Sequence, residues 1–193
     1  MRGLILKARR TTSRSTASRP SLLAVSLAAL VAAGVLAGLA DAGTVTQGKG
    51  LPPWRIGRTY VQGPGLVRSV RPKSPYSPGC VPNASAAARI DYYRGLRVAW
   101  VRGAGGKLRL FDVATSRAGD RSSDGFVIES SRRGAVHDRH PGATSAFGKG
   151  PLALGATSLT VFRHSGKETF TTLVYWFDAR GVLTALETFA GGC

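Results

Sequence analysis

The densest group of side chains with catalytic potential is His137, Asp138 and His140. Histidines at this spacing share one face of a helix, so two imidazoles could bind a metal if a third ligand came from elsewhere. Arg139 lies between them, and its charge would oppose a cation. We therefore expect no metal site. The residues are instead typical of a helix end, where histidine suits the negative end of the helix dipole.

A serine hydrolase would need a nucleophile on a strained turn, a histidine base and an acid that orients it. Serines occur near these histidines at Ser122, Ser123, Ser130 and Ser131, but no Gly-x-Ser-x-Gly motif is present. The glycine-rich residues 103–107 lack the Ser or Thr that follows the lysine of a phosphate-binding loop, and they predict a hairpin turn. The sequence thus predicts a protein without enzymatic activity or cofactor. A secreted hydrolase remains a third alternative.

The N-terminal region is typical of an export signal. Residues 1–20 carry basic side chains and no acid, and residues 21–40 carry no charge. The sequence Ala40-Asp41-Ala42 has the small-x-small form of a signal-peptidase site, so we expect cleavage after Ala42. The alternative is a retained signal anchor with its N-terminus inside. In both cases the rest of the chain would be exported to the periplasm, cell wall or medium.

Both cysteines, Cys80 and Cys193, lie in the part expected to be exported, where disulfides can form. The Pro-Gly pair before Cys80 predicts a turn that would present its thiol to a partner rather than a catalytic nucleophile. A bridge between the two would tie the last residue to the first half of the exported part. Two free thiols are the alternative.

The chain is strongly basic. It has 27 Lys and Arg against 10 Asp and Glu, a formal net charge of +17, and 43% hydrophobic residues, which is enough for a packed core. Export argues against a nucleic-acid partner. An anionic wall polymer, a membrane surface or an acidic protein could attract this charge. The alternative is that the scattered arginines only solvate the surface.

The part after the signal segment is predicted to contain two related halves. The expected organisation is a signal peptide or anchor at 1–42, a flexible leader at 43–53, and helix-on-sheet halves at 54–118 and 119–193. Each half begins with an extended apolar tetrapeptide, followed by a short helix that a proline ends. These helices are expected at residues 63–71 and between Ser130 or Ser131 and His140.

Antiparallel strands are expected to follow each helix. Residues 158–164, 169–177 and 182–189 are rich in β-branched and aromatic side chains and predict a three-strand meander. Residues 96–101 and 108–113 match its last two strands, with Trp100 and Trp176 as counterparts in two cores. Both faces of 169–177 are apolar, so one should pack on the helix and the other on the second half or a partner.

Two segments carry a resemblance to a known family. Residues 125–131 read Gly-Phe-Val-Ile-x-Ser-Ser before a Val-x-x-x-His-Pro helix end, and Tyr175-Trp176-Phe177-Asp178-x-x-Gly181 forms the closing hairpin. This pattern resembles the tandem helix-on-sheet modules of β-lactamase inhibitory protein and the small outer-membrane assembly lipoproteins of the SmpA/OmlA type. The resemblance covers about residues 54–193 and implies an α+β fold and a non-catalytic interaction module. Glu129 replaces a glycine common in those modules, and their acylated cysteine is missing.

These observations predict an exported, non-catalytic module that binds a protein in the cell envelope or medium, either as an inhibitor or in assembly. The alternative is a basic module that adheres to anionic wall polymer or membrane surface. Tyrosine and arginine dominate the energetics of many interfaces. The candidate contact residues are therefore Tyr92, Tyr93, Arg94, Arg97 and Arg109, with Arg97 and Arg109 expected on the more exposed face of their strands.

Overall fold

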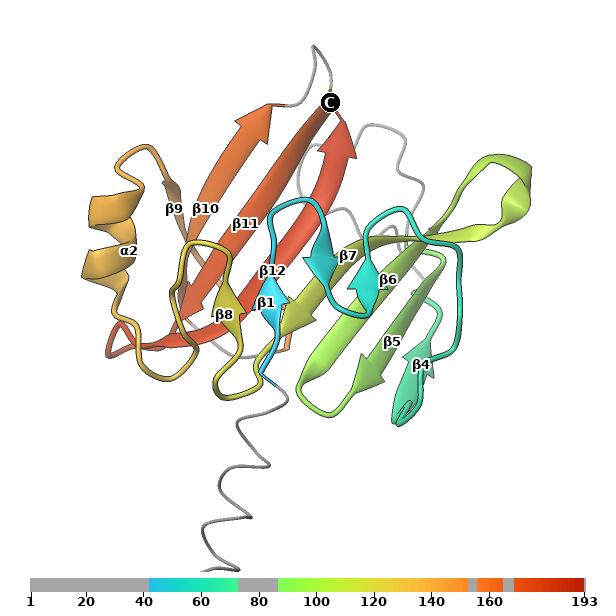
Figure 1. Cartoon of the computed structure of the whole chain (residues 1–193), viewed down its shortest axis with the longest axis horizontal. Helices are drawn as coiled ribbons and strands as arrows, with labels where there is room; N and C mark the ends of the chain where they lie inside the picture. Colours follow the sequence, from blue (N-terminus) through green and yellow to red (C-terminus); the bar gives the residue numbers. More distant parts are fainter. Residues whose placement is uncertain (1–41, 73–86, 153–155, 165–168, 193) are drawn as a thin grey trace, which may run out of the picture. The chain divides into compact units, whose positions relative to one another are not determined.

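The computed structural model describes residues 42–72, 87–152, 156–164 and 169–192. Their main feature is one eight-stranded antiparallel sheet in the order β4-β5-β6-β7-β12-β11-β10-β9 (Figure 1). Its strands are β4 (Arg68–Val70), β5 (Arg89–Tyr93), β6 (Leu96–Arg102), β7 (Leu108–Thr115), β9 (Thr144–Phe147), β10 (Thr157–His164), β11 (Thr169–Phe177) and β12 (Leu183–Gly192).

The remaining elements are short. A parallel pair joins β1 (Thr44–Val45) to β8 (Arg121–Ser122), and an antiparallel pair joins β2 (Gly50–Leu51) to β3 (Trp54–Arg55). The 3₁₀ turn η1 (Ala104–Gly106) connects β6 to β7, and α2 (Arg133–Arg139) is the one α-helix of the described ranges. None of the helices described there has the length and apolar character needed to cross a membrane.

Two antiparallel meanders build the sheet by joining edge to edge. Strands β5–β6–β7 form the first, β10–β11–β12 form the second, and β12 pairs with β7 from Leu186↔Thr115 to Phe189↔Asp112. The expected α+β fold of two helix-on-sheet subdomains is therefore wrong. The described residues are mostly β, with one short α-helix, and the strands of both meanders belong to one eight-stranded sheet.

The helix expected at residues 63–71 is also absent. Pro64 and Gly65 form a turn there, and the residues after it form β4, which pairs with β5. Glycine and proline lower helical propensity, and pairing with β5 satisfies the backbone of β4. The helix expected before Pro141 is confirmed as α2, which begins at Arg133. The predicted strands of the second meander and the predicted turn at 103–107 are confirmed as well.

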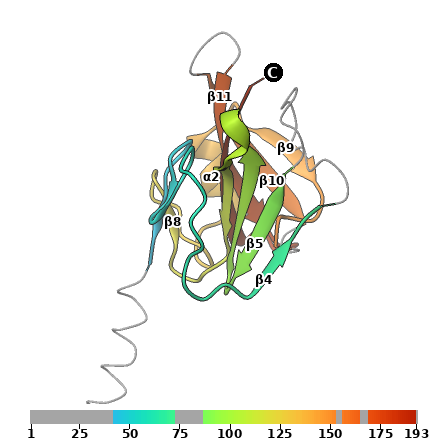
Figure 2. The ribbon, with the colours of Figure 1, turned by 90° about the vertical axis from the view of Figure 1, so that its right-hand side faces the viewer.

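The two faces of the sheet have different surroundings. Figure 2 shows β8 beside the N-terminal strands on one side of the sheet. The main core lies on that covered face, where the short elements pack on the strands. Its fully buried members include Val45, Leu51, Trp100, Ile128, Val136, Tyr175 and Phe177.

Side chains of the opposite face form separate apolar clusters. Trp176 packs there beside Phe170, Val174 and Phe189, whereas Trp100 lies in the main core. The two tryptophans therefore lie on opposite faces, and the expectation that they are counterparts is wrong. The covered face is closed by the short elements, and the other face, called the pocket face below, carries the candidate site.

Residues 43–53 contain β1 and β2 and are held to the rest of this unit by a buried carboxylate. Asp120 accepts hydrogen bonds from the Gly43 backbone amide at 2.7 Å, from the Thr115 hydroxyl and from Arg117 Nε. The Asp120 side chain is 1% exposed, so its charge is satisfied by these donors. This contact places β1 beside β8 over the main core.

Candidate functional site

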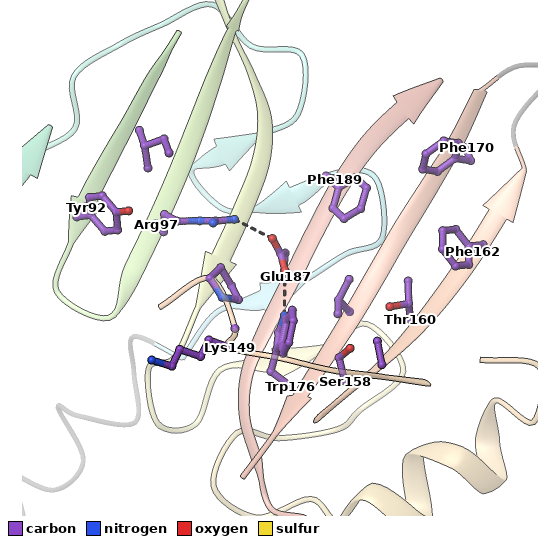
Figure 3. A pocket seen from close by; sticks show the side chains of 15 residues that line it. Tyr92, Arg97, Lys149, Ser158, Thr160, Phe162, Phe170, Trp176, Glu187 and Phe189 are labelled. Carbon is purple, nitrogen blue, oxygen red and sulfur yellow. Dashed lines mark hydrogen bonds and ion pairs between the residues drawn. The ribbon is translucent and has the colours of Figure 1, made fainter. Parts of the chain in front are cut away.

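The pocket face contains a cavity of about 810 Å³ (Figure 3). Its walls come from β5 and β6 of the first meander and from β10, β11 and β12 of the second, together with residues that follow β9. The cavity therefore exists because the two meanders share one sheet. Its apolar walls include Ile90, Phe162, Phe170, Val174, Trp176 and Phe189.

Three phenylalanines line one side of this cavity. The ring centroids of Phe162 and Phe170 lie 6.0 Å apart, and those of Phe170 and Phe189 lie 6.4 Å apart, both with edge-to-face geometry. Such aromatic pairs add to the free energy that burial alone provides. Phe162 is 50% exposed and stands at the open side, whereas Phe170 and Phe189 are each 7% exposed. The rings thus form a preformed apolar wall whose accessible member is Phe162.

A buried ion-pair network forms the polar part of the cavity. Arg97 Nη2 donates to Glu187 Oε1 at 2.7 Å and also to Asp112 Oδ2. Trp176 Nε1 donates to Glu187 Oε2 at 2.9 Å, as Figure 3 shows. The Arg97 side chain is 3% exposed. Because charges so deeply buried must be paired, this network fixes β6, β7 and β12 to one another.

The other lining residues add a small number of polar groups, of which Ser158 is buried. Lys149 is exposed and comes from the segment after β9, while Ser158 and Thr160 are presented by β10. Alternation along β10 places both of these side chains on the pocket face, since Leu159 between them belongs to the main core. A ligand in the cavity would therefore meet apolar walls, the two hydroxyl groups of β10 and the exposed Lys149.

The titratable side chains among the described lining residues are Tyr92, Arg97, Lys149 and Glu187. They include no histidine and no cysteine, and their one carboxylate, Glu187, already accepts hydrogen bonds from Arg97 and Trp176. Within the described ranges, no group of three His, Cys, Asp or Glu side chains is placed to hold a metal ion. What the cavity can do chemically is remove an apolar molecule from water.

The histidine cluster predicted from the sequence is divided by the structure. His140 Nε2 lies 2.5 Å from Asp124 Oδ2, and the Tyr175 hydroxyl donates to both Asp124 oxygens, at 2.8 and 2.7 Å. The His137 side chain is 55% exposed and lies 3.8 Å from Asp138. The contacts among His140, Asp124 and Tyr175 therefore attach the end of α2 and the loop after β8 to β11. They lie among core aromatic rings and not in the cavity.

The titration of two groups in this cluster reflects those contacts. Burial acts to raise the pKa of the Asp124 carboxyl, but hydrogen bonds with Ser122, Tyr175 and His140 outweigh it and leave the pKa below its usual 3.8. Burial and the neighbouring Asp124 carboxylate raise the pKa of the Tyr175 hydroxyl well above its usual 10.0. The carboxylate form of Asp124 and the neutral form of Tyr175 are therefore the stable pair.

The five predicted contact residues are distributed over different surfaces. Tyr92 and Arg97 line the cavity. Tyr93 instead packs against Trp54, with ring centroids 4.9 Å apart and the rings tilted. Arg94 is exposed in the turn between β5 and β6, and Arg109 is exposed with its Nη1 donating to the Gly57 carbonyl at 3.2 Å. The expected exposure of Arg97 is wrong because two carboxylates neutralise it inside the sheet.

Sequence reasoning missed Asp112 and Glu187, the partners of Arg97. They lie 15 and 90 residues from Arg97 in the chain, so no local spacing indicates the contact. The available signal was a charged residue near the middle of each of three largely apolar strands: Arg97 in β6, Asp112 in β7 and Glu187 in β12. Cys80 and Cys193 lie outside the described residues, as does the segment before Ala42, so the disulfide and the cleavage site stay predictions.

Comparison with known proteins gives no further guide to this site. No protein-family model, no curated protein and no solved structure matches the chain, so the assignment depends on the geometry described above.

Proposed function

We propose that this protein is an exported, non-catalytic binding protein that holds an apolar small molecule in the cavity of the pocket face. The observation that carries the proposal is the apolar wall of Phe162, Phe170 and Phe189, exposed at Phe162, beside a space of about 810 Å³. Small-molecule sites usually occupy roughly 300–1,000 Å³ and have mostly apolar walls with a few placed polar groups. This cavity has both properties.

The charges of the cavity favour a neutral ligand body. Arg97 is held by Glu187 and Asp112, so its guanidinium is engaged within the protein. The one exposed cation among the described lining residues is Lys149 at the rim. Transfer of apolar surface from water contributes roughly 25 cal/mol per Å². That gain, and not a charge contact, would provide most of the affinity.

A titration of the full chain with the uncharged fluorophore N-phenyl-1-naphthylamine tests this proposal. We expect saturable binding that is insensitive to salt. Thr160→Trp places an indole in the cavity and should weaken binding about tenfold or more, a loss of about 1.4 kcal/mol. Thr44→Trp at an exposed site of β1 is the matched control and should leave binding unchanged. Equal affinity in the two variants would refute the proposal.

Binding of a protein partner, the leading function predicted from the sequence, is the second candidate function. Exposed apolar side chains at both edges of the sheet favour it: Phe147 of β9 is 89% exposed, and Val67 beside β4 is 72% exposed. Edge strands present unpaired backbone groups to which a partner strand can add. Capture of one defined envelope protein at both about 50 and about 500 mM salt would support it. Capture of anionic polymer alone, lost at the higher salt, would support the basic-surface alternative.

A further inference from the structure

A second cavity, of about 590 Å³, lies beside the main core on the covered face of the first meander. Its deep wall is formed by Trp100 and Leu110, which are 1% and 2% exposed. Trp54 forms a side wall, and Arg55 and Arg58 line the cavity from exposed positions. Trp100 and Arg97 point to opposite faces of β6, so this second cavity is separate from the pocket-face cavity.

The aromatic side of the second cavity is held in place by packing. The Trp54 ring lies 4.9 Å from that of Tyr93 and 6.1 Å from that of Trp100. Gly63 packs closely on the same indole: a Cβ at this position would lie only 2.5 Å from Trp54 Cη2. A hydrogen bond fixes the Trp100 ring, since its Nε1 donates to the buried Asp91 at 3.0 Å. A flat apolar group would therefore meet a rigid surface.

The charge of the second cavity is one-sided. Its described lining includes Arg55 and Arg58 and no Asp or Glu. Within the described part of the chain, no ion pair joins either arginine to a carboxylate, in contrast to the paired Arg89, Arg97 and Arg117. Guanidinium groups bind carboxylate, sulfonate and phosphate through charge-assisted hydrogen bonds. The two arginines thus present donors for an anion beside an apolar wall.

We propose that the second cavity binds a small amphipathic anion, with a flat apolar body against Trp54 and Leu110 and an acidic head group at Arg55 and Arg58. Stacking on the indole and burial of the apolar body would provide affinity. Arg55 and Arg58 would select anions over neutral molecules of the same shape. This site is independent of the pocket-face cavity, whose proposed ligand is neutral.

Two fluorophores that differ by one sulfonate test this inference on the full chain. 8-Anilinonaphthalene-1-sulfonate has the ring system of N-phenyl-1-naphthylamine plus the acidic group. The double variant Arg55→Gln/Arg58→Gln should weaken sulfonate binding about tenfold and leave binding of the neutral probe unchanged. Arg121→Gln/Arg139→Gln makes the same change in net charge at exposed positions of β8 and α2, and should affect neither probe.

Further arms separate this inference from the proposed function and identify the head group. Thr160→Trp should leave sulfonate binding intact; if it abolishes that binding, the anion occupies the pocket face and the inference is refuted. Displacement of the sulfonate probe by 1-naphthoate or by 1-naphthyl phosphate supports the inference and shows which head group is preferred. Displacement by neither, or equal sulfonate affinity in the two double variants, overturns it. Circular dichroism of each variant verifies the fold.

Discussion

Arg97 of β6 and Glu187 of β12 are joined by a 2.7 Å hydrogen bond although 90 residues separate them in the chain. The bond passes over β7, the strand through which the first meander pairs with the second. This side-chain bond therefore connects the two meanders, and the β7–β12 pairing connects them through backbone hydrogen bonds. The cavity of the pocket face lies directly beside this junction and depends on it.

Loss of Arg97 should destabilise the sheet strongly. Arg97→Met leaves Asp112 and Glu187 as buried carboxylates without this guanidinium, and removal of one partner of a buried pair costs about 3–5 kcal/mol. Arg102→Met at the exposed end of the same strand should cost no more than about 0.5 kcal/mol. Urea unfolding measures both free energies. Equal losses in the two variants would contradict the structural role of the pair.

The two faces of the sheet should respond differently to truncation of a phenylalanine. Phe177 is fully buried in the main core, so Phe177→Ala should lower the free energy of unfolding by about 3–5 kcal/mol. Phe162 borders a cavity and is half exposed, so Phe162→Ala should cost less than about 1 kcal/mol while weakening binding of N-phenyl-1-naphthylamine. A larger loss of stability at Phe162 than at Phe177 would show that the core has been placed on the wrong face.

The Asp124 contacts should make stability depend on pH in the acid range. The pKa of Asp124 in the folded state is below its usual 3.8. The carboxylate therefore contributes fully to the free energy of unfolding above pH 3.8, and this contribution is lost as the pH falls through the folded-state pKa. Between about pH 5 and pH 2, the wild type should therefore lose more free energy of unfolding than Asp124→Asn, which cannot ionise.

Asp138→Asn serves as the control for this comparison, because the Asp138 side chain is 84% exposed. Its acid profile should follow that of the wild type. If Asp124→Asn also follows the wild type, Asp124 carries no lowered pKa in the folded protein.

Glu129 occupies a backbone conformation that favours glycine. Its φ of 71° lies in the left-handed region, where a Cβ costs roughly 1–2 kcal/mol. Glu129→Gly should raise the free energy of unfolding by up to about 1 kcal/mol after the entropy cost of glycine is subtracted. Glu129→Ala retains the Cβ and should give no such gain. A greater stability of the alanine variant than of the glycine variant in urea unfolding would contradict this assignment.

Local patterns in the sequence predicted most strands of the sheet. Residues 158–164, 169–177 and 182–189 carry the β-branched and aromatic side chains typical of strands, and each forms one. Both faces of 169–177 are apolar, but the second face does not pack on another sheet: one face lies in the main core, and the other lines the cavity of the pocket face. The proline at 141 marked the end of α2, since proline cannot continue a helix.

The joining of the meanders could not be predicted in this way. The contact between β7 and β12 is made by backbone groups, which every residue except proline carries, so it leaves no specific pattern. The similarity of the two sets of hairpins therefore suggested two helix-on-sheet subdomains, whereas the hairpins are neighbours in one sheet. The predicted exposure of Arg97 was wrong for the same reason. Whether its side chain is buried depends on β12, which lies two strands away from β6 in the sheet.

The central claim is that an apolar molecule occupies the cavity formed where the two meanders meet. A crystal structure of the full chain grown with N-phenyl-1-naphthylamine tests it most directly. The account predicts the naphthyl ring between Phe162, Val174 and Phe189, next to the Arg97–Glu187 pair. An empty cavity with the probe at saturating concentration, or the probe bound only at the edge strands β4 and β9, would contradict it.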